Sequence, residues 1–398
     1  MELARRLLDA LRARPVRAAA ALAGGLALAA LVGAALGPSY TTPVHDRRSA
    51  RAPRRTRWAD FSVAVRVRLL RSVGDFLSAC VLPRAQPSAV ELPGGARGAP
   101  AKMLVYLPPG VDSVEAAAAA RLPVYVNAHG GGYIAGFAED DDAFCALLAR
   151  SAGVVVLSVA YALAPEAPPP AGARDVARAA QWAATALRAP RVALGGFSAG
   201  GCYALAAAAH LSGEEGSGAA AGASGARVDV ALCVAFFPPV DLGYDSRATF
   251  AHKCPYGKEL FYEAYLRDTP PSQLSSPLIS PACAPPERFP RSVLILTGSL
   301  AEPNLPDIEA FARRLCEHAE AEAARAPPGA RKREVRHVDF PHVPHGWPHL
   351  PAFVLSRLGA PRAAGGPGTG LDARDEAFAL VVEAVRGALV GGAVPLLS

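Results

Sequence analysis

Gly196-Phe197-Ser198-Ala199-Gly200 is the stretch of this 398-residue chain that decides its fold. It follows the apolar run 191–194, which predicts a short buried strand, and it precedes the alanine-rich run 201–210, which predicts a helix. A Gly-x-Ser-x-Gly run between a strand and a helix places the serine on a sharp, strained turn with its hydroxyl exposed. Glycines are needed beside it because a Cβ there would collide with neighbouring backbone. We therefore expect Ser198 to be a nucleophile.

A second glycine run, His129-Gly130-Gly131-Gly132-Tyr133, lies earlier in the chain and follows the strand-like segment 122–128. Acyl transfer puts negative charge on a carbonyl oxygen, and preorganised N–H donors must meet that charge. Glycine lets the backbone itself approach a substrate. We expect the N–H groups of Gly130, Gly131 and Ala199 to form such an oxyanion hole.

These two motifs resemble those of the hormone-sensitive-lipase-like group of α/β-hydrolase esterases. Residues 161–166, Tyr-Ala-Leu-Ala-Pro-Glu, resemble that group's Tyr-x-Leu-Ala-Pro-Glu segment, and residues 276–281 resemble its Ser-Pro-Leu stretch. The resemblance covers roughly residues 100–350. It implies an α/β-hydrolase fold with a helical cap, and hydrolysis of a carboxylic ester without a metal or an organic cofactor.

The order of apolar segments agrees with this fold. Near-continuous apolar strands alternate with helices, which is typical of a mainly parallel central sheet with helices on both faces. The predicted strands are 102–107, 123–128, 154–159, 192–195, 228–236, 293–297 and 334–340. The predicted helices are 141–152, 173–187, 199–211, 259–267 and 307–319, with a closing helix around 378–389. Segments 213–226, 321–332 and 359–370, rich in small residues, proline and arginine, are predicted to be surface loops.

We divide the chain into an arginine-rich N-terminus with a hydrophobic segment (1–37), a basic linker (38–57) and an α/β-hydrolase domain (58–398). Apolar residues recur at three- and four-residue steps from Trp58 to Cys80, including Val65 and Leu69, which predicts an amphipathic helix. This region (about 58–95) and the proline-containing region 244–290 are the predicted cap pieces. An ordinary packing helix or a membrane-surface helix would show the first pattern equally well.

Residues 18–37 carry no charged side chain over twenty positions, about the length of a helix that crosses a bilayer. The pattern predicts a protein anchored by one N-terminal span, for example in the endoplasmic reticulum. A cleaved secretory signal, and hence a secreted protein, or a mitochondrial presequence would have similar features. Arginines lie on both sides of the segment, so their distribution does not determine its orientation.

The net charge of +6 is unevenly distributed, because eleven arginines lie before residue 58. The excess is therefore local, and we expect no nucleic-acid partner. None of the seven cysteines forms a close pair at metal-ligand spacing. Cys254 and Cys283 flank the second cap piece and would be able to pair in an oxidising compartment. The sequence does not indicate an oligomeric state.

A serine hydroxyl needs a base to take its proton. In α/β-hydrolases the chain order is serine, acid, histidine. His345-Gly346-Trp347 follows the last predicted strand and matches the family's histidine, small residue and aromatic residue, so we expect His345 to be the base. His342 is the alternative, and His349 is expected to be a solvated loop residue. No carboxylate or cysteine at ligand spacing supports a metal site among these histidines and His337.

The acid is where the chain departs from the family pattern. The family has Gly-x-x-Asp after the penultimate strand, but strict spacing from Gly298 leads here to Ala301. Glu302 is one position later, and its longer side chain is expected to reach the imidazole. Asp307 is the alternative, although it is placed to begin a helix. Glu166 and Asp175 precede Ser198, so the chain order disfavours them as the acid.

We therefore expect a serine carboxylesterase or lipase-like hydrolase that forms a covalent acyl-enzyme on a small-to-medium acyl ester or a lipid ester. Tyr133 and Phe137 are expected to shape the substrate pocket. An amidase or lactonase would use the same triad. A non-catalytic ligand-binding member of the fold is a further alternative, because Ala301 stands where the family has its acid.

Overall fold

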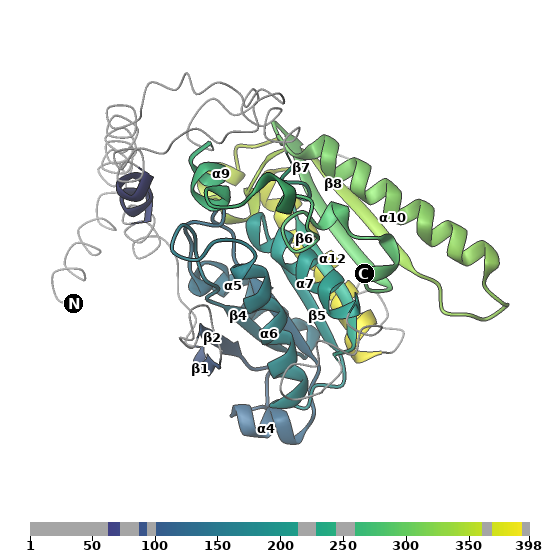
Figure 1. The fold of residues 1–398 in the computed structure, drawn as a ribbon. Helices are drawn as coiled ribbons and strands as arrows, with labels where there is room; N and C mark the ends of the chain where they lie inside the picture. The colour runs from purple at the N-terminus through teal and green to yellow at the C-terminus, as the bar shows by residue number, and fades with distance from the viewer. Residues whose placement is uncertain are drawn as a thin grey trace, which may run out of the picture.

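The computed structural model describes residues 63–71, 87–93, 101–213, 228–243, 259–359 and 368–391. Within these ranges eight strands form one sheet in the order β1-β2-β4-β3-β5-β6-β7-β8 (Figure 1). Their bounds are β1 Ser88–Leu92, β2 Ala101–Tyr106, β3 Val124–Ala128, β4 Val155–Val159, β5 Val192–Phe197, β6 Val230–Phe236, β7 Ser292–Leu300 and β8 Glu334–Pro344. β2 runs antiparallel to both β1 and β4, and the other neighbours are parallel. The predicted mainly parallel sheet is confirmed.

Helices cover both faces of this sheet. They are α4 Val114–Ala119, α5 Asp142–Ala152, α6 Ala171–Thr185, α7 Ala199–Gly213, α9 Glu259–Leu266, α10 Leu305–Arg325, α11 Ala352–Leu355 and α12 Gly370–Val385. Apolar side chains of α6, α7 and α10 share one buried cluster with the sheet, and those of α5 and α12 share a second one. In Figure 1, α12 lies on the far side of the sheet from α6 and α7.

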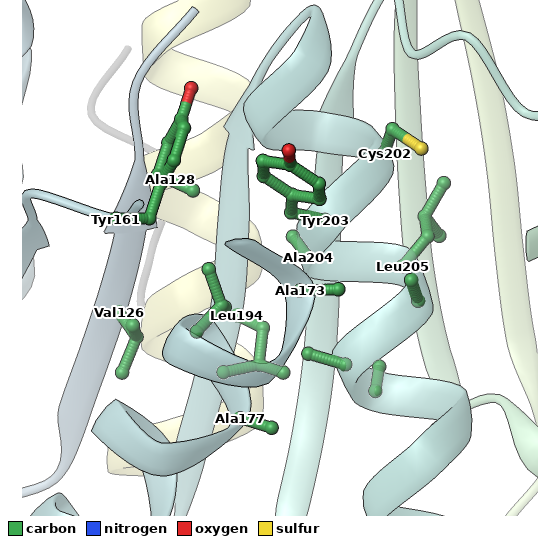
Figure 2. Packing of buried hydrophobic residues seen from close by; sticks show 14 of the residues in the cluster. Val126, Ala128, Tyr161, Ala173, Ala177, Leu194, Cys202, Tyr203, Ala204 and Leu205 are labelled. Atoms are coloured by element: carbon green, nitrogen blue, oxygen red, sulfur yellow. The ribbon is translucent and has the colours of Figure 1, made fainter. Parts of the chain in front are cut away.

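The apolar strands have no polar face because both faces are covered. Along β3, Val124 and Val126 enter the cluster with α6 and α7, whereas Tyr125 between them enters the cluster with α5. Successive side chains of a strand point to opposite faces, so a strand buried on both sides has a continuous apolar run. Figure 2 shows the first cluster, where small residues such as Ala173 and Ala204 let the two helices pack closely.

Several elements differ from the sequence prediction, among them β1, α4 and α10. β1 was not predicted, because it is a short edge strand in which only Leu92 is buried. α4 was also missed, although Ser113 caps it by accepting a hydrogen bond from the N–H of Ala116. α10 continues to Arg325, so residues 321–325 are helical rather than part of a loop. Their alanine and glutamate side chains are good helix formers.

The prediction of an N-terminal membrane span is corrected. In the part of the chain that the structure describes, none of the helices combines the length and the apolarity needed to cross a membrane. Residues 18–37, on which the prediction was made, lie outside the described residues. The described residues give no support to the signal anchor or to the membrane-anchored localisation that depended on it, and neither is proposed further.

The two predicted cap pieces are described only in part. Residues 63–71 are helical, but their buried side chains are Val63 and Val67, whereas the predicted apolar position Leu69 is 40% exposed. The Arg66 guanidinium lies 3.9 Å from the carboxylate of Glu263 in α9, so this helix reaches the second piece. Residues 38–57, most of the remainder of 58–95, residues 244–258 and Cys254 lie outside the described residues. The domain division stays a prediction, whereas Cys283 is a free cysteine in the structure, so its suggested pairing with Cys254 is corrected.

Candidate active site

Ser198 sits between the last residue of β5 and the first residue of α7, with a left-handed φ of +52°. Its N–H donates to the carbonyl of Phe236, at the end of the neighbouring strand, over 2.9 Å. A Cβ on Gly196 or Gly200 would lie 2.3 or 2.0 Å from the carbonyl oxygen of Ala128. Backbone therefore packs against backbone on both sides of the turn, which is why this turn requires glycine there.

His345 reaches Ser198 from the turn after β8. Its Nε2 lies 2.9 Å from Ser198 Oγ. Trp347 anchors that turn because its side chain is fully buried. The His345 ring also packs against Phe237, with 4.6 Å between ring centroids. The structure thus brings together the expected nucleophile and base, although their sequence separation is large.

Glu302 lies on the other side of the imidazole. Its Oε2 is 2.5 Å from His345 Nδ1, and the glutamate side chain is fully buried. Its Oε1 accepts hydrogen bonds from the N–H and the side-chain amide of Asn304, at 3.1 and 3.2 Å. Because a carboxylate only accepts, Nδ1 carries the proton and Nε2 is left to accept from Ser198. The alternative acid, Asp307, lies in the first turn of α10.

The glycine loop after β3 faces the same turn. A Cβ on Gly130 would lie 3.9 Å from Ser198 Cβ, and Gly131 has a φ of +119°. Within the described ranges, the N–H groups of Gly130 and Gly131 donate to no backbone carbonyl. The N–H of Ala199 belongs to the first residue of α7, where a helix provides no partner of its own. Gly130 and Ala199 therefore lie close to Ser198, and Gly131 follows Gly130 in the same loop. The role of the three N–H groups as an oxyanion hole stays a prediction.

His129 and Tyr161 hold the glycine loop in place, a role that the sequence prediction missed. His129 Nδ1 lies 2.6 Å from the Gly130 carbonyl, and the Tyr161 hydroxyl donates to the His129 carbonyl over 2.8 Å. The two rings stack with centroids 4.1 Å apart. Burial lowers the pKa of His129, although the hydrogen bond to Gly130 opposes it, so the imidazole is neutral and donates through Nδ1. His129 begins the glycine run 129–133, and Tyr161 begins the segment 161–166 that resembles the family. Their places in these two motifs were the sequence signal for this role.

The structure separates the two residues expected to shape the pocket. Tyr133 is 2% exposed, and its ring stacks on Tyr265 of α9 with centroids 4.0 Å apart. Phe137 instead lies at the surface, 36% exposed. Tyr133 therefore belongs to the buried core beneath α9. A pocket role for either residue stays a prediction.

The four histidines of the disfavoured metal site have separate surroundings. His337 Nε2 is 2.9 Å from Thr297 Oγ1, His342 is exposed, and His345 joins Ser198 and Glu302. His349 is exposed, as expected for a solvated residue, but its Nε2 also lies 2.7 Å from Oδ1 of the buried Asp141, a partner that the sequence prediction missed. The sequence gives no local indication of this pair, because the two residues are 208 positions apart.

The two carboxylates disfavoured as the acid have structural contacts. Glu166 receives Nη1 and Nη2 of Arg71 at 3.0 and 2.9 Å. Arg71 also donates to the carbonyls of Ala164 and Ile134. Asp175 is fully buried inside α6, and it accepts a hydrogen bond from the N–H of Ala162.

A family described as the alpha/beta hydrolase fold matches residues 125–348, more than half of the chain and a range that contains Ser198, Glu302 and His345. The chain belongs to the α/β-hydrolase family. Its resemblance to the hormone-sensitive-lipase-like esterases is also confirmed. A solved esterase of the bacterial hormone-sensitive lipase family is 26% identical, with a TM-score of 0.55 over 85% of this chain and 94% of its own.

Two further relatives of this α/β-hydrolase are ester hydrolases. The solved hyperthermophilic esterase of the archaeon Pyrobaculum calidifontis is 25% identical, with a TM-score of 0.60 over 81% of this chain and 91% of its own. Carboxylic ester hydrolase LipN of Mycobacterium tuberculosis is 38% identical over 118 residues, which is 28% of this chain. The match spans only 29% of the length of that curated relative.

Proposed function

We propose that this α/β-hydrolase is a carboxylic ester hydrolase that acts through Ser198, His345 and Glu302. The observation that carries the proposal is the continuous series of contacts from Ser198 Oγ to His345 Nε2 (2.9 Å) and from His345 Nδ1 to Glu302 (2.5 Å). Both distances are within hydrogen-bond reach, so the serine proton has an acceptor and the acceptor is oriented. The ester-hydrolase names of the relatives support the same reaction.

In the proposed reaction, Ser198 Oγ attacks the carbonyl carbon of the ester while its proton passes to His345 Nε2. The carbonyl oxygen takes the negative charge and receives the N–H groups of Gly130, Gly131 and Ala199. When the tetrahedral intermediate collapses, His345 gives the proton to the departing alcohol oxygen, and an acyl-enzyme remains. Water, deprotonated by His345, then attacks the acyl carbon and releases the acid and the serine.

Glu302 supports this cycle without exchanging a proton. Its carboxylate fixes the imidazole tautomer that presents Nε2 to Ser198, and it stabilises the imidazolium formed after proton transfer. The two hydrogen bonds from Asn304 orient the buried carboxylate, so that its other oxygen faces His345. This complete arrangement counts against the non-catalytic alternative that Ala301 had kept open.

We further propose that residues 58–95 and 244–290 form a cap above these residues. The contact of Arg66 with Glu263, and the burial of Val63 and Val67, support an association between the described parts of both pieces. An enclosed, apolar cap favours small-to-medium acyl esters or lipid esters as substrates, because it removes acyl carbons from water. An amide or lactone panel tests the alternative reactions.

The test uses the full chain, p-nitrophenyl esters of graded acyl length, and a fluorophosphonate probe that reacts with activated serines. Wild type should hydrolyse the esters and be labelled, whereas Ser198→Ala should lose both properties. Ser356→Ala removes an exposed hydroxyl from the end of α11 and should behave as wild type. A folded wild type that neither hydrolyses any ester nor reacts with the probe would overturn the proposal.

A further inference from the structure

The turn that carries His345 contains a second histidine paired with a buried carboxylate. His349 ends the short helical turn η7, Trp347–His349, four residues after His345. Its Nε2 lies 2.7 Å from Oδ1 of Asp141, whose side chain is fully buried. Since a carboxylate only accepts hydrogen bonds, the proton between them is on His349 Nε2.

Asp141 connects this pair to the strand that leads into the glycine loop. Its Oδ2 accepts from the side-chain amide of Asn127 over 2.7 Å. Asn127 is fully buried in β3, three residues before Gly130. Asp141 ends the short helical turn η2, Ala138–Asp141, and Ser158 of β4 donates to the Ala138 carbonyl over 2.8 Å. The carboxylate therefore joins the His345 turn to the base of the oxyanion loop.

The His349 ring also contacts the nucleophile turn. It packs edge-on against Phe197, with ring centroids 4.6 Å apart and an interplanar angle of 81°. Phe197 directly precedes Ser198 and is itself 1% exposed. One side chain thus contacts the segment before the nucleophile and, through Asp141 and Asn127, the strand before the oxyanion glycines.

The charge on Asp141 makes this contact hard to replace. A carboxylate removed from water is stable only if donors surround it. His349 and Asn127 each donate to one of its oxygens. Without the imidazole, Oδ1 of Asp141 loses a hydrogen-bond donor inside the protein. The η7 turn then also loses its hydrogen bond to η2.

We propose that His349 is a positioning residue, which with Asp141 holds His345 at hydrogen-bond distance from Ser198 and in register with the oxyanion loop. The inference rests on the proposed function, because it acts through His345. His349 itself touches no reacting atom. Small displacements of a base relative to its nucleophile strongly slow a reaction, whereas substrate binding in the cap is little changed.

The test compares His349→Ala with His349→Gln, whose side-chain amide N–H can replace Nε2–H. His342→Asn is the matched control: His342 is exposed on the same segment, and asparagine tolerates its left-handed φ of +73°. In His349→Ala, kcat for a short p-nitrophenyl ester and the rate of fluorophosphonate labelling should both fall about 10- to 100-fold, with KM within about twofold of wild type. His349→Gln should recover most of both rates, and His342→Asn should match wild type.

Asp141→Asn provides a second route if His349→Ala folds poorly, because it is isosteric and leaves no buried charge. It should also lower kcat, and the His349→Ala, Asp141→Asn double variant should lose no more than the larger of the two single losses. An additive loss, or a His349→Ala enzyme with wild-type kcat, would overturn the inference while the Ser198-dependent activity of wild type stands. A wild type that does not react with the probe would instead be a failure of the proposed function.

Discussion

Two turns at the carboxyl edge of the sheet, one after β5 and one after β7, provide the nucleophile and the acid of the proposed triad. Both pass through a left-handed residue, Ser198 with φ +52° and Ala301 with φ +59°. The first follows its family motif at every position, whereas the second has its acid one residue late. The difference follows from what fills the space around each turn.

The turn after β5 is enclosed by main chain. The glycines beside Ser198 lie so close to the Ala128 carbonyl that no Cβ fits, so the spacing of the motif cannot shift. After β7, by contrast, the gap to His345 is spanned by a side chain. Glu302 has one more methylene than aspartate, and it reaches the same imidazole from the next position along the chain. The spacing of a motif is therefore fixed where backbone packs against backbone. It can vary by a residue where a side chain makes the contact.

The largest effect is expected when the acid loses its charge. Glu302→Gln should lower kcat by up to about 10⁴-fold with little change in KM, because the amide no longer fixes the imidazole tautomer or stabilises the imidazolium. Steady-state kinetics on a p-nitrophenyl ester measures this. Asp307→Asn is the control and should remain within about twofold of wild type. If Asp307→Asn were the inactive variant, the acid would lie in the first turn of α10, and the comparison of the two turns would fail.

The next effect tests the enclosed turn. Gly200→Ala adds a Cβ 2.0 Å from the Ala128 carbonyl oxygen and 2.4 Å from that of His129, both of them backbone atoms. We expect the free energy of unfolding to fall by about 3 kcal/mol, measured by urea denaturation. Gly387→Ala provides the control, because a Cβ there meets nothing within 4 Å. Equal stability of the two variants would show that the turn is not closed by backbone contact.

A smaller effect should follow from shortening the acid. Glu302→Asp retains the charge but removes the methylene that compensates for the late position. We expect kcat to fall about 10- to 100-fold, less than for the amide variant, because a carboxylate displaced by about 1 Å still acts on the imidazole. The ratio of the kcat of Glu302→Asp to the kcat of wild type measures how much the length of the acidic side chain contributes. A fully active Glu302→Asp would mean that the loop itself moves to close the gap.

The smallest effect concerns a loop held by a surface ion pair rather than by packing. Burial raises the pKa of Glu166, but the hydrogen bonds and charge of Arg71 outweigh it, so the pKa is lowered from 4.5. The resulting stability is present above the ordinary value of 4.5 and is lost as pH falls through the lowered one. Glu166→Gln should therefore destabilise the protein at pH 7 by less than about 1 kcal/mol, because the pair is half exposed. Thermal unfolding of both proteins at neutral pH and well below 4.5 should show the difference disappear at the acidic pH; a constant difference would contradict the pKa shift.

The parts of this molecule that could be predicted from sequence are those whose signal is local. Ser198 is placed by its flanking glycines, and His345 by the strand before it and the tryptophan that follows. The strands of the central sheet were recognisable because burial on both faces makes them continuously apolar. The edge strand β1 has no such signal, since Leu92 is its one buried residue.

The contacts that join distant segments could not be predicted. Asp141 and His349 are 208 residues apart, and Arg71 and Glu166 are 95 apart. In the sequence, none of these four residues can be told from an ordinary charged surface residue. Their pairing is visible only in the folded structure. The acid is intermediate: Glu302 was expected from its side-chain length, but only coordinates place its carboxylate beside the imidazole.

The helix that follows Ser198 has a practical consequence for protein engineering. From Ala199 to Ala209 every residue of α7 is buried, most of them alanine or glycine, so a larger side chain at any of these positions has no space to occupy. A mutant library directed at new substrates should therefore leave the whole helix unchanged. Substitutions should instead be directed at the segments above the sheet. A larger side chain there would contact substrate or solvent rather than a neighbouring helix.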